Sequence, residues 1–118
     1  MSLTHFDIVG PARRDLATIF RDSETQFGFA ARERYEALVA QAIRDLVENP
    51  TRPGAQLDGG RIHYHLRHSK MRVIGEKVRE PRHYLVVRID GSLLIVLAVV
   101  YDAMVEGART RIEEGEAG

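Results

Sequence analysis

The sequence predicts a small α+β protein in which an antiparallel helical hairpin packs on one face of an antiparallel sheet. Two features of the chain indicate this fold class. Apolar residues recur at helical spacing up to about residue 48, and an alternation with period two begins at residue 61. The chain has 118 residues, enough for one domain with a core, so we expect a single domain over residues 1–118.

The first half of the chain is expected to form a strand and two helices. Residues 3–8 alternate roughly between apolar and polar, which predicts a short N-terminal strand. A helix over residues 11–27 begins with a proline, which suits a first turn, and Gly28 is its natural stop. A second helix ends at Asn49-Pro50, because proline disfavours helical geometry in the residue before it. The expected core positions of the two helices are Leu16, Ile19, Phe20, Ala31, Tyr35, Leu38, Val39, Ala42, Ile43 and Leu46.

The second half is expected to form a three-stranded antiparallel meander in one sheet. Residues 50–60 contain two prolines and three glycines, which predicts an irregular connector. Residues 68–81 predict a long loop, and Asp90-Gly91 is a strong hairpin signal between two further strands, at 83–89 and 92–100. The first strand of the meander, residues 61–67, carries Ile62, Tyr64 and Leu66 on one face and Arg61, His63, His65 and Arg67 on the other.

The last strand is apolar on both faces, so it must be central or covered. With both helices on one side, the other face of the sheet is expected to stay open, with the cationic residues of 61–67 on it. Residues 102–112 predict a short C-terminal helix, and residues 113–118 are expected to be a disordered acidic tail.

Charge is spread unevenly along a chain whose net charge is zero. Residues 1–60 hold 7 basic and 9 acidic side chains, residues 61–90 hold 8 and 3, and residues 91–118 hold 2 and 5. A local basic segment of this kind can attract phosphates or an acidic partner. Cysteine is absent, which excludes disulfides, thiolate metal sites and cysteine nucleophiles. No apolar run approaches the roughly 18 residues that cross a bilayer, and no signal core is apparent, so we expect a cytoplasmic protein with no membrane partner.

Several short motifs follow one another in a specific order. They are Ala12-Arg13-Arg14-Asp15-Leu16, Gln26-Phe27-Gly28, Ala31 to Leu38, Leu46-Val47-Glu48-Asn49-Pro50, Gly60-Arg61, and Pro81 to Arg88. Their order and spacing resemble the RelE/ParE superfamily of toxins from type II toxin–antitoxin systems, and the ParE branch most. The resemblance covers about residues 5–105 and implies the RelE/ParE-like α+β fold.

The chain departs from the family pattern at four positions. Phe27 stands where the family usually has tryptophan, and Val87 where it usually has tyrosine. At the end of the last strand, Ala98 replaces a common arginine and Tyr101 a common histidine. In RelE-like ribonucleases, basic residues on the sheet and a terminal tyrosine or histidine align the RNA 2′-hydroxyl and move protons. The loss of the arginine therefore weakens a ribonuclease interpretation.

Three functions remain open from the sequence. The resemblance implies first a ParE-like toxin that inhibits DNA gyrase, arrests growth, stabilises a plasmid or chromosome, and is neutralised by a cognate antitoxin. The alternative is a RelE-like ribosome-dependent mRNA endoribonuclease, the one hypothesis that makes the protein an enzyme and gives it the ribosome and mRNA as partners. The second alternative is a non-toxic member that acts only as a binding partner, which the replacements at Ala98 and Tyr101 suggest.

Basic residues supply the candidate sites. The candidate binding surface is Arg61, His63, His65, Arg67, Arg82 and Arg88, since guanidinium groups bind phosphates or acidic segments bidentately. If the protein is a ribonuclease, the candidate catalytic residues are Arg61, Arg67, Lys70, Arg82 and Tyr101. The alternative is that these residues have no binding role and only form the solvent-exposed face of a sheet. His63 and His65 point the same way on a strand, but no third ligand has a fixed spacing, so no metal and no other cofactor is expected.

Overall fold

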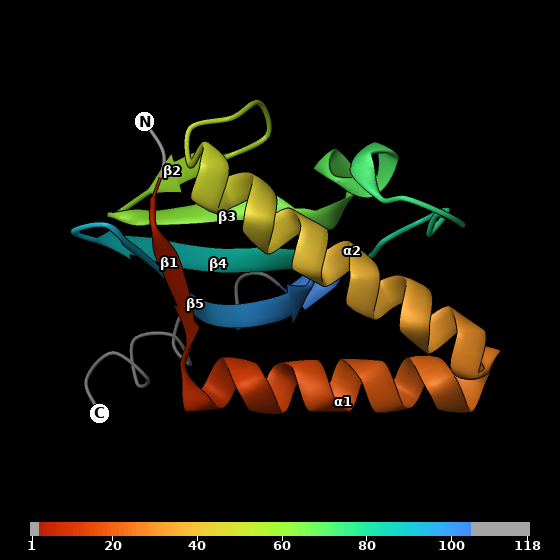
Figure 1. Cartoon of the computed structure of the whole chain (residues 1–118). Coiled ribbons are helices and arrows are strands. Elements are labelled where there is room, and N and C mark those ends of the chain that lie inside the picture. The colour runs from red at the N-terminus through yellow and green to blue at the C-terminus, as the bar shows by residue number, and fades with distance from the viewer. Residues whose placement is uncertain (1–2, 105–118) are drawn as a thin grey trace.

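The computed structural model describes residues 3–104, which form a helical hairpin and a five-stranded sheet (Figure 1). The helices are α1, Gly10–Phe27, and α2, Phe29–Glu48. The strands are β1, His5–Ile8; β2, Gln56–Asp58; β3, Arg61–His65; β4, His83–Asp90; and β5, Leu93–Tyr101. Both helices lie on the same face of the sheet, which confirms the predicted α+β architecture.

The strands lie in the order β1-β5-β4-β3-β2. β1 pairs with β5 in parallel, and all other pairs are antiparallel. The predicted meander is therefore β3-β4-β5, and the N-terminal strand extends it beyond β5. This places β5 between two neighbours inside the sheet, as its apolar sequence predicted.

The strand β2 lies in the segment that was predicted to be irregular. Its pairing with β3 sets Gln56 opposite His63 and Asp58 opposite Arg61. Gly59 and Gly60 connect the two strands with φ angles of 58° and 82°, the pair of positive values that a type I′ hairpin turn needs. The prediction was wrong because it counted these glycines as breakers, whereas two adjacent glycines before a strand are also a hairpin signal.

The helix boundaries confirm the prediction to within a residue. Pro11 lies in the first turn of α1, and Gly28 alone separates the two helices, with a φ of 95° that other residues rarely adopt. α2 ends at Glu48, and Asn49 is extended before Pro50. These local signals produce a tight hairpin whose apolar stripes both face the sheet.

Asp15 joins α1 to the middle of the sheet. Its carboxylate accepts a hydrogen bond of 3.1 Å from the backbone N–H of Val99 in β5. Val99 follows a bulge, because Val86 pairs with Ala98 while Val87 pairs with Val96, which leaves one extra residue in β5. The aspartate of the Ala-x-x-Asp-Leu motif thus has a packing role at an irregular point of the sheet.

Two predicted boundaries in the meander need correction. Asp90 pairs with Leu93 at the end of β4, so the turn residues are Gly91 and Ser92, and of the two only Gly91 has a positive φ, 62°. This is the pattern of a type II′ turn rather than the predicted turn at Asp90-Gly91 with two positive values. The strand predicted for residues 61–67 ends at His65, where the chain enters two short 3₁₀ turns, Leu66–His68 and Lys70–Arg72. The side chain of His65 accepts the N–H of Arg67 at 3.1 Å and so starts the first turn.

The sheet is buried on both faces around β4 and β5. The helix-side core joins α1 and α2 to side chains that include Leu85, Val87, Leu94, Val96 and Val99. The opposite face carries a second buried cluster made of Val86, Ile95, Leu97, Ala98 and Val100. These five residues are at most 7% exposed, so the prediction of an open second face was wrong for this part of the sheet.

The described chain ends in a single 3₁₀ turn, Asp102–Met104. Most of the predicted C-terminal helix at 102–112, and the whole predicted acidic tail at 113–118, lie outside the described residues. Neither of the two long helices combines the length and the apolar character that spanning a membrane requires, over the residues that the structure describes.

Candidate functional site

A cluster of polar side chains gathers where β3 ends, β4 begins and β5 ends. Antiparallel pairing brings these three ends together, with His65 opposite Tyr84 and His83 opposite Tyr101. Tyr35 of α2 reaches the same place from the helix side of the sheet. We call Tyr35, His65, Arg82, His83, Tyr101 and Asp102 the sheet-end cluster.

Asp102 is the acidic centre of this cluster. One oxygen, Oδ2, lies 3.3 Å from both Nε2 of His65 and Nε of Arg82, and the Asp102 N–H donates to the Arg82 carbonyl at 2.8 Å. Burial alone would raise the pKa of Asp102, but the hydrogen bond from His65 and the charge of Arg82 outweigh it and lower the pKa. Asp102 is therefore a carboxylate at neutral pH.

His65 is buried in a neutral form with a defined tautomer. It is 3% exposed, and burial lowers its pKa although the hydrogen bond to Asp102 opposes that effect. Because Nδ1 accepts the N–H of Arg67, the proton lies on Nε2 and is donated to Asp102. The ring packs edge-on against Tyr84, with 4.8 Å between the centroids. His65 is thus a structural residue and does not belong to an exposed cationic face, contrary to the prediction.

Tyr35 and His83 form a second neutral pair. The Tyr35 hydroxyl lies 2.6 Å from Nδ1 of His83, and its oxygen also accepts the backbone N–H of Arg82 at 3.1 Å. Burial lowers the pKa of His83 to about 4 and raises the pKa of Tyr35 to about 12. At neutral pH both groups are therefore uncharged.

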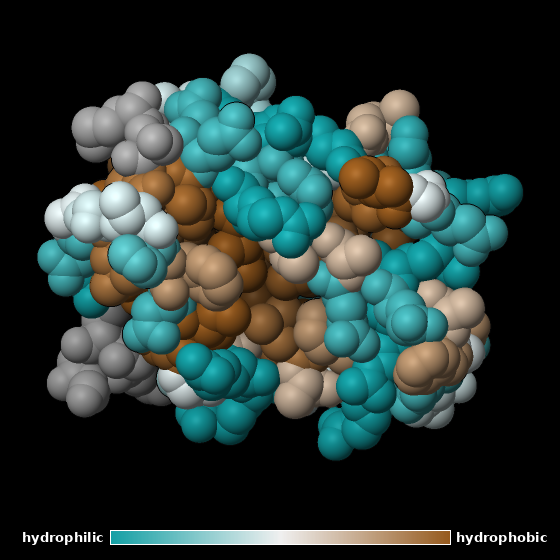
Figure 2. Space-filling view, viewed as in Figure 1, coloured by the Kyte–Doolittle hydropathy of each residue, from teal (hydrophilic) through white to brown (hydrophobic). Residues whose placement is uncertain are grey.

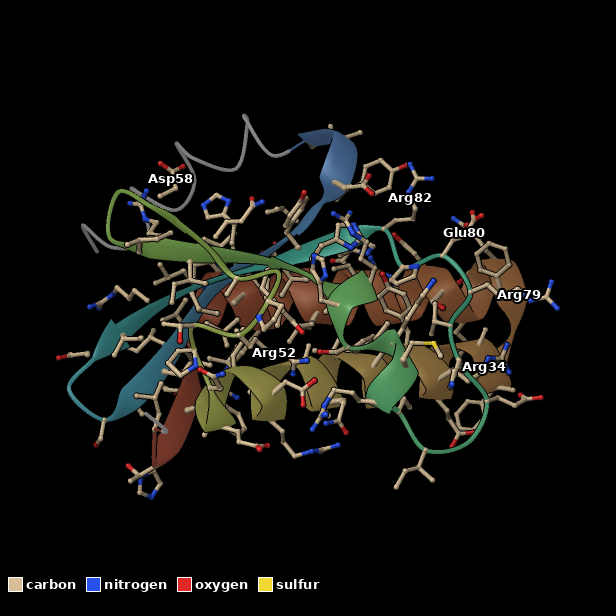
Figure 3. The ribbon with its side chains drawn as sticks, turned by 90° about the horizontal axis from the view of Figure 1, so that it is seen from above. Arg34, Arg52, Asp58, Arg79, Glu80 and Arg82 are labelled. Atoms are coloured by element: carbon tan, nitrogen blue, oxygen red, sulfur yellow. The ribbon has the colours of Figure 1, made fainter. Side chains whose placement is uncertain are left out.

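Arg82 carries the exposed positive charge of the cluster. Besides its contact with Asp102, it donates from Nη2 to the Tyr101 hydroxyl at 3.3 Å, and its guanidinium carbon lies 5.4 Å from the centre of that ring. Figure 3 shows Arg82 beside the end of β5, on the side of the sheet away from Arg34 and Arg52. Tyr101 is 41% exposed, so the Arg82–Tyr101 pair is the part of the cluster that faces solvent.

The structure assembles only some of the candidate catalytic residues. Arg82 and Tyr101 touch, and Arg67 lies near them, since both arginines act on the pKa of His65. Lys70 lies one turn further along and donates to the Arg79 carbonyl at 3.3 Å. Arg61 lies apart, because it begins β3 and pairs with Asp58, which Figure 3 shows at the opposite end of the sheet from Arg82.

The candidate binding surface is likewise divided. Arg67 and Arg82 are exposed at the sheet end. Arg61, His63 and Arg88 are half-buried, on β3 and β4. His65 is buried between these two groups, so the six residues do not form one surface. Tyr35, in contrast, was predicted only as core, because a hydroxyl on an apolar helical stripe gives no sequence signal of a distant partner.

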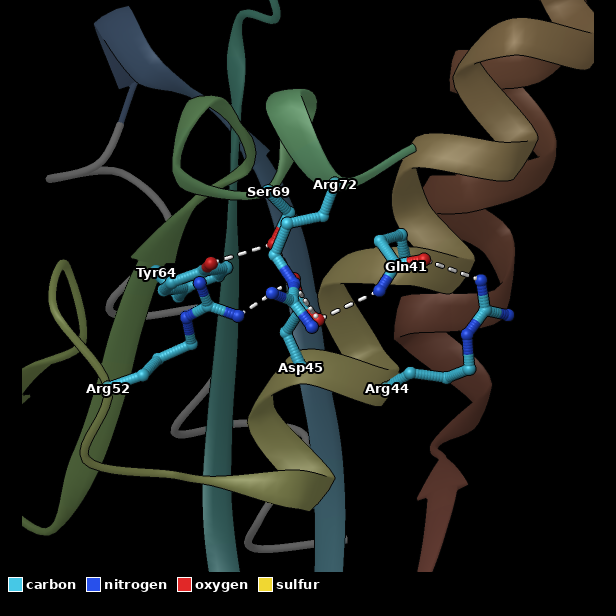
Figure 4. Close-up of polar contacts among 7 residues, drawn as sticks. All are labelled: Gln41, Arg44, Asp45, Arg52, Tyr64, Ser69 and Arg72. Carbon is cyan, nitrogen blue, oxygen red and sulfur yellow. Dashed lines mark hydrogen bonds and ion pairs between the residues drawn. The ribbon is translucent and has the colours of Figure 1, made fainter. Parts of the chain in front are cut away.

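A second polar cluster is centred on the buried carboxylate of Asp45 in α2 (Figure 4). Its carboxylate accepts hydrogen bonds from Ser69 at 2.6 Å, from Gln41 at 2.8 Å and from Arg72 at 2.8 Å, and Arg52 lies 2.8 Å away. The hydroxyls of Tyr64 and Ser69 are 2.7 Å apart and extend the network to β3. Burial alone would raise the pKa of Asp45, but these hydrogen bonds, led by that of Ser69, lower it. We call Asp45 and these five partners the Asp45 network.

The Asp45 network fixes the segment that follows β3. Arg52 belongs to the connector before β2, Ser69 lies between the two 3₁₀ turns and Arg72 ends the second of them, so one carboxylate joins α2 to two other pieces of the chain. This positions Arg67 and Lys70 relative to the sheet end. The sequence does not reveal the network, because the residues that contact one another in it are between 4 and 27 residues apart and have no repeating pattern.

Residues 3–104 bring no three histidine, aspartate or glutamate side chains together in a way that could hold a metal ion. The sheet-end cluster offers an exposed guanidinium beside a tyrosine hydroxyl, with two neutral histidines behind them. Such a surface can bind an acidic or phosphorylated group, and its buried members cannot exchange protons readily near pH 7.

Comparisons with known proteins indicate the fold and the family of this chain. The fold is similar to a solved structure of the chromosomal ParDE toxin–antitoxin system from P. aeruginosa, with a TM-score of 0.62 and 11% identity over 84% of this chain and 96% of that one. No curated protein sequence matches the chain. The family model described as the ParE toxin of the type II toxin–antitoxin system, parDE, matches residues 8–106. The chain therefore belongs to the ParE toxin family of type II toxin–antitoxin systems.

Proposed function

We propose that this protein is a toxin that inhibits DNA gyrase by binding to it, and that a cognate antitoxin neutralises it in the cytoplasm. The observation that carries the proposal is the family match over residues 8–106, together with the ParE-like order of strands and helices. Inhibition by binding needs no catalytic constellation, only an exposed surface on a rigid fold.

The chemistry of the sheet-end cluster favours binding over RNA cleavage. A general base should have a pKa near the working pH, whereas the pKa of His83 is held at about 4 by burial and His65 is neutral and buried. Ala98, where the resemblance leads one to expect arginine, is 2% exposed in the second buried cluster. Arg61 is at the far end of β3 from Arg82 and cannot join it on one phosphate.

The helix-side surface suits the antitoxin. Figure 2 shows a band of apolar surface between polar ridges on the face that carries both helices. Side chains on this side that are only partly buried include Ile8, Val9, Ile19, Phe20 and Val47. An antitoxin segment that folds on binding would bury this apolar surface with its own apolar side chains.

The sheet end is the surface that we assign to the gyrase contact. Arg67 and Arg82 are exposed there, and the guanidinium of Arg82 is oriented by Asp102 and Tyr101. Oriented guanidinium groups bind carboxylates and phosphates with defined geometry. Arg61, His63 and Arg88 of the predicted binding surface are not part of this contact, because they lie on other parts of β3 and β4.

The test is pulse-labelling of DNA and protein synthesis in a bacterium directly after the chain is induced without an antitoxin. Early loss of DNA synthesis with translation intact is the expected result. An immediate stop in translation would instead establish the ribonuclease alternative, and no effect on either would leave a non-toxic binding partner. Inhibition of supercoiling by purified gyrase checks the target directly.

One variant separates inhibition by binding from cleavage, and a second tests the gyrase contact. Tyr101→Phe removes the hydroxyl but keeps the ring beside Arg82, so a gyrase inhibitor should retain most of its activity, while a ribonuclease that moves a proton through Tyr101 should lose it. Arg82→Gln removes the exposed charge and should weaken gyrase inhibition at least several-fold. Arg21→Gln, at an exposed position on α1, is the matched control.

A further inference from the structure

The tip of the helical hairpin carries two exposed aromatic side chains. Phe27 ends α1 and Phe29 begins α2, and Gly28 alone separates them. Phe27 is 73% exposed and Phe29 is 62% exposed. Figure 1 shows that the tip projects beyond the ends of the strands, so both rings are presented at a protruding point of the molecule. Aromatic side chains are enriched where one protein binds another.

Contacts between the two helices fix the geometry of the tip. The N–H of Gly28 donates to the Glu24 carbonyl at 2.9 Å, and the Gly28 carbonyl accepts the N–H of Arg32 at 3.2 Å. The Arg32 guanidinium also lies 3.5 Å from the Glu24 carboxylate of α1 and 2.9 Å from that of Glu36 in α2. A phenylalanine on such a fixed backbone has only two side-chain torsions, so it loses little conformational entropy when a partner immobilises it.

The exposed area suits a pocket in another protein better than a second copy of this chain. The two rings together expose on the order of 250 Å², because a whole aromatic side chain presents roughly 150 to 250 Å². A stable interface buries about 800 Å² on each partner. The tip is therefore too small to form a dimer by itself, whereas one or two buried aromatic anchors can dominate the affinity of a larger contact.

The tip is continuous with the sheet end. Phe29 lies six residues before Tyr35 on α2, or roughly 9 Å along the helix, and the Tyr35 hydroxyl accepts the N–H of Arg82. Figure 3 shows Arg82, Arg79 and Arg34 one after another along this edge of the molecule. A partner that meets the guanidinium of Arg82 can therefore reach the two rings as well.

We propose that Phe27 and Phe29 are aromatic anchors that insert into an apolar pocket of DNA gyrase, as part of the same contact that Arg82 makes at the sheet end. The inference rests on the proposed function, which supplies the partner, and it adds a second point of contact. A charged contact and an apolar anchor at separate positions together fix the orientation of the toxin on its target.

Inhibition of supercoiling by purified gyrase is the first test. Phe27→Ala/Phe29→Ala should weaken inhibition by roughly tenfold or more and leave Tm unchanged, because both rings are exposed. Phe27→Leu/Phe29→Leu keeps apolar side chains and should restore most of the inhibition. Leu57→Ala is the matched control, since Leu57 is 78% exposed on β2 and should not be needed. A double alanine variant that inhibits as strongly as the wild type would overturn the proposal.

A fluorescent label tests the contact itself, since the chain has no cysteine of its own that would react. An environment-sensitive dye on Ala30→Cys, an exposed position beside the tip, should shift its emission to shorter wavelength when gyrase is added. The same dye on Ala40→Cys, an exposed position in the middle of α2, should show no shift. A shift at both positions, or at neither, would count against insertion of the tip.

Other occupants of the tip would give different results. If the double alanine variant inhibits gyrase fully but escapes neutralisation by the cognate antitoxin, the tip belongs to the antitoxin contact. If the wild-type chain sediments as a dimer that the double alanine substitution dissociates, the tip binds a second copy. Either result overturns the proposal.

Growth arrest separates failure of this inference from failure of the proposed function. If the wild-type chain does not inhibit gyrase, the proposed function fails, and arrest of a bacterium that expresses each variant then decides about the tip. Arrest that the double alanine variant loses and Leu57→Ala keeps would support the tip as the anchor for a different target protein. Equal arrest by all three chains, or none by the wild type, would overturn the role of the tip.

Discussion

The Tyr35 hydroxyl and Nδ1 of His83 lie 2.6 Å apart although 48 residues separate them in the chain. The contact joins the N-terminal half of α2 to the first residue of β4 and helps to bury both rings. Burial in turn holds the pKa of His83 at about 4, which gives the stability of the fold a defined pH dependence.

We expect the free energy of unfolding to fall as the pH drops from 6.5 to 4. In this window a histidine of the unfolded chain takes up a proton near pH 6.5, whereas His83 in the folded chain does not, so protonation favours unfolding. For His83 the loss should be on the order of 2 to 3 kcal/mol, and His65, whose pKa is also lowered, acts in the same direction. Urea denaturation at pH 7.0, 6.0, 5.0 and 4.5 measures the slope.

His83→Gln should flatten this slope at the cost of a lower stability at pH 7. His5→Gln is the matched control, because His5 is exposed on β1 and its ring hydrogen-bonds to the neighbouring Thr4. If the His83 variant keeps the full pH dependence, another group is responsible for it.

Tyr35→Phe should destabilise the protein by about 1 to 3 kcal/mol, the cost of leaving partly buried polar groups without partners. The variant removes the hydroxyl that hydrogen-bonds to Nδ1 of His83 and accepts the Arg82 N–H. Tyr101→Phe loses only a hydroxyl on an exposed ring and should cost clearly less. Chemical denaturation of the two variants side by side checks the difference, and equal losses would contradict the role of Tyr35.

Asp45→Asn should destabilise by about 3 kcal/mol or more, because it removes the buried carboxylate that two arginines pair with. The remaining amide can neither neutralise Arg52 and Arg72 nor accept on both sides as the carboxylate does. Asp22→Asn, on the exposed side of α1, should change stability by less than about 0.5 kcal/mol. Thermal unfolding at neutral pH compares them, and a small loss at Asp45 would count against the network.

Gly54→Ala should be more destabilising than Gly28→Ala, although the two glycines have nearly the same φ, 98° and 95°. Each variant forces a side chain to a positive φ that other residues rarely adopt, at about 1 to 3 kcal/mol. At Gly54 the new Cβ would also lie 2.5 Å from the His68 ring, whereas at Gly28 nothing lies within 4 Å. Adding His68→Ala should recover part of the Gly54→Ala loss, and no recovery would show that the clash is relieved in another way.

Helix positions, the helix hairpin and the β4–β5 hairpin could be predicted because their signals are local. Gly28 and Pro50 act through their own backbone geometry, and an apolar stripe reflects the period of the helix that carries it. The same local reasoning was wrong for the strand end at His65, where a side chain caps its own backbone and starts a turn. Strand periodicity does not contain that information, because residues 61–67 keep alternating after the strand has ended.

The sites were less accessible to prediction than the fold. Arg82 and Tyr101 were named as candidates, and they do meet. Tyr35 and Asp45 were missed as polar partners. Each forms hydrogen bonds with residues of other elements, and a single sequence does not indicate which distant residues will lie close together. Arg61 was grouped with Arg82 by charge, and antiparallel pairing places the two at opposite ends of the sheet.

The sequence by itself determined the α+β class, the helix boundaries, the apolar central strand and the resemblance to the ParE family, since each follows from neighbouring residues or from their order. Only the tertiary structure decided which charges are exposed and which are buried. Burial depends on the elements that pack over a residue, and these come from distant parts of the chain. His65 and His83 are therefore neutral, although the basic residues next to them in the sequence predict a cationic surface.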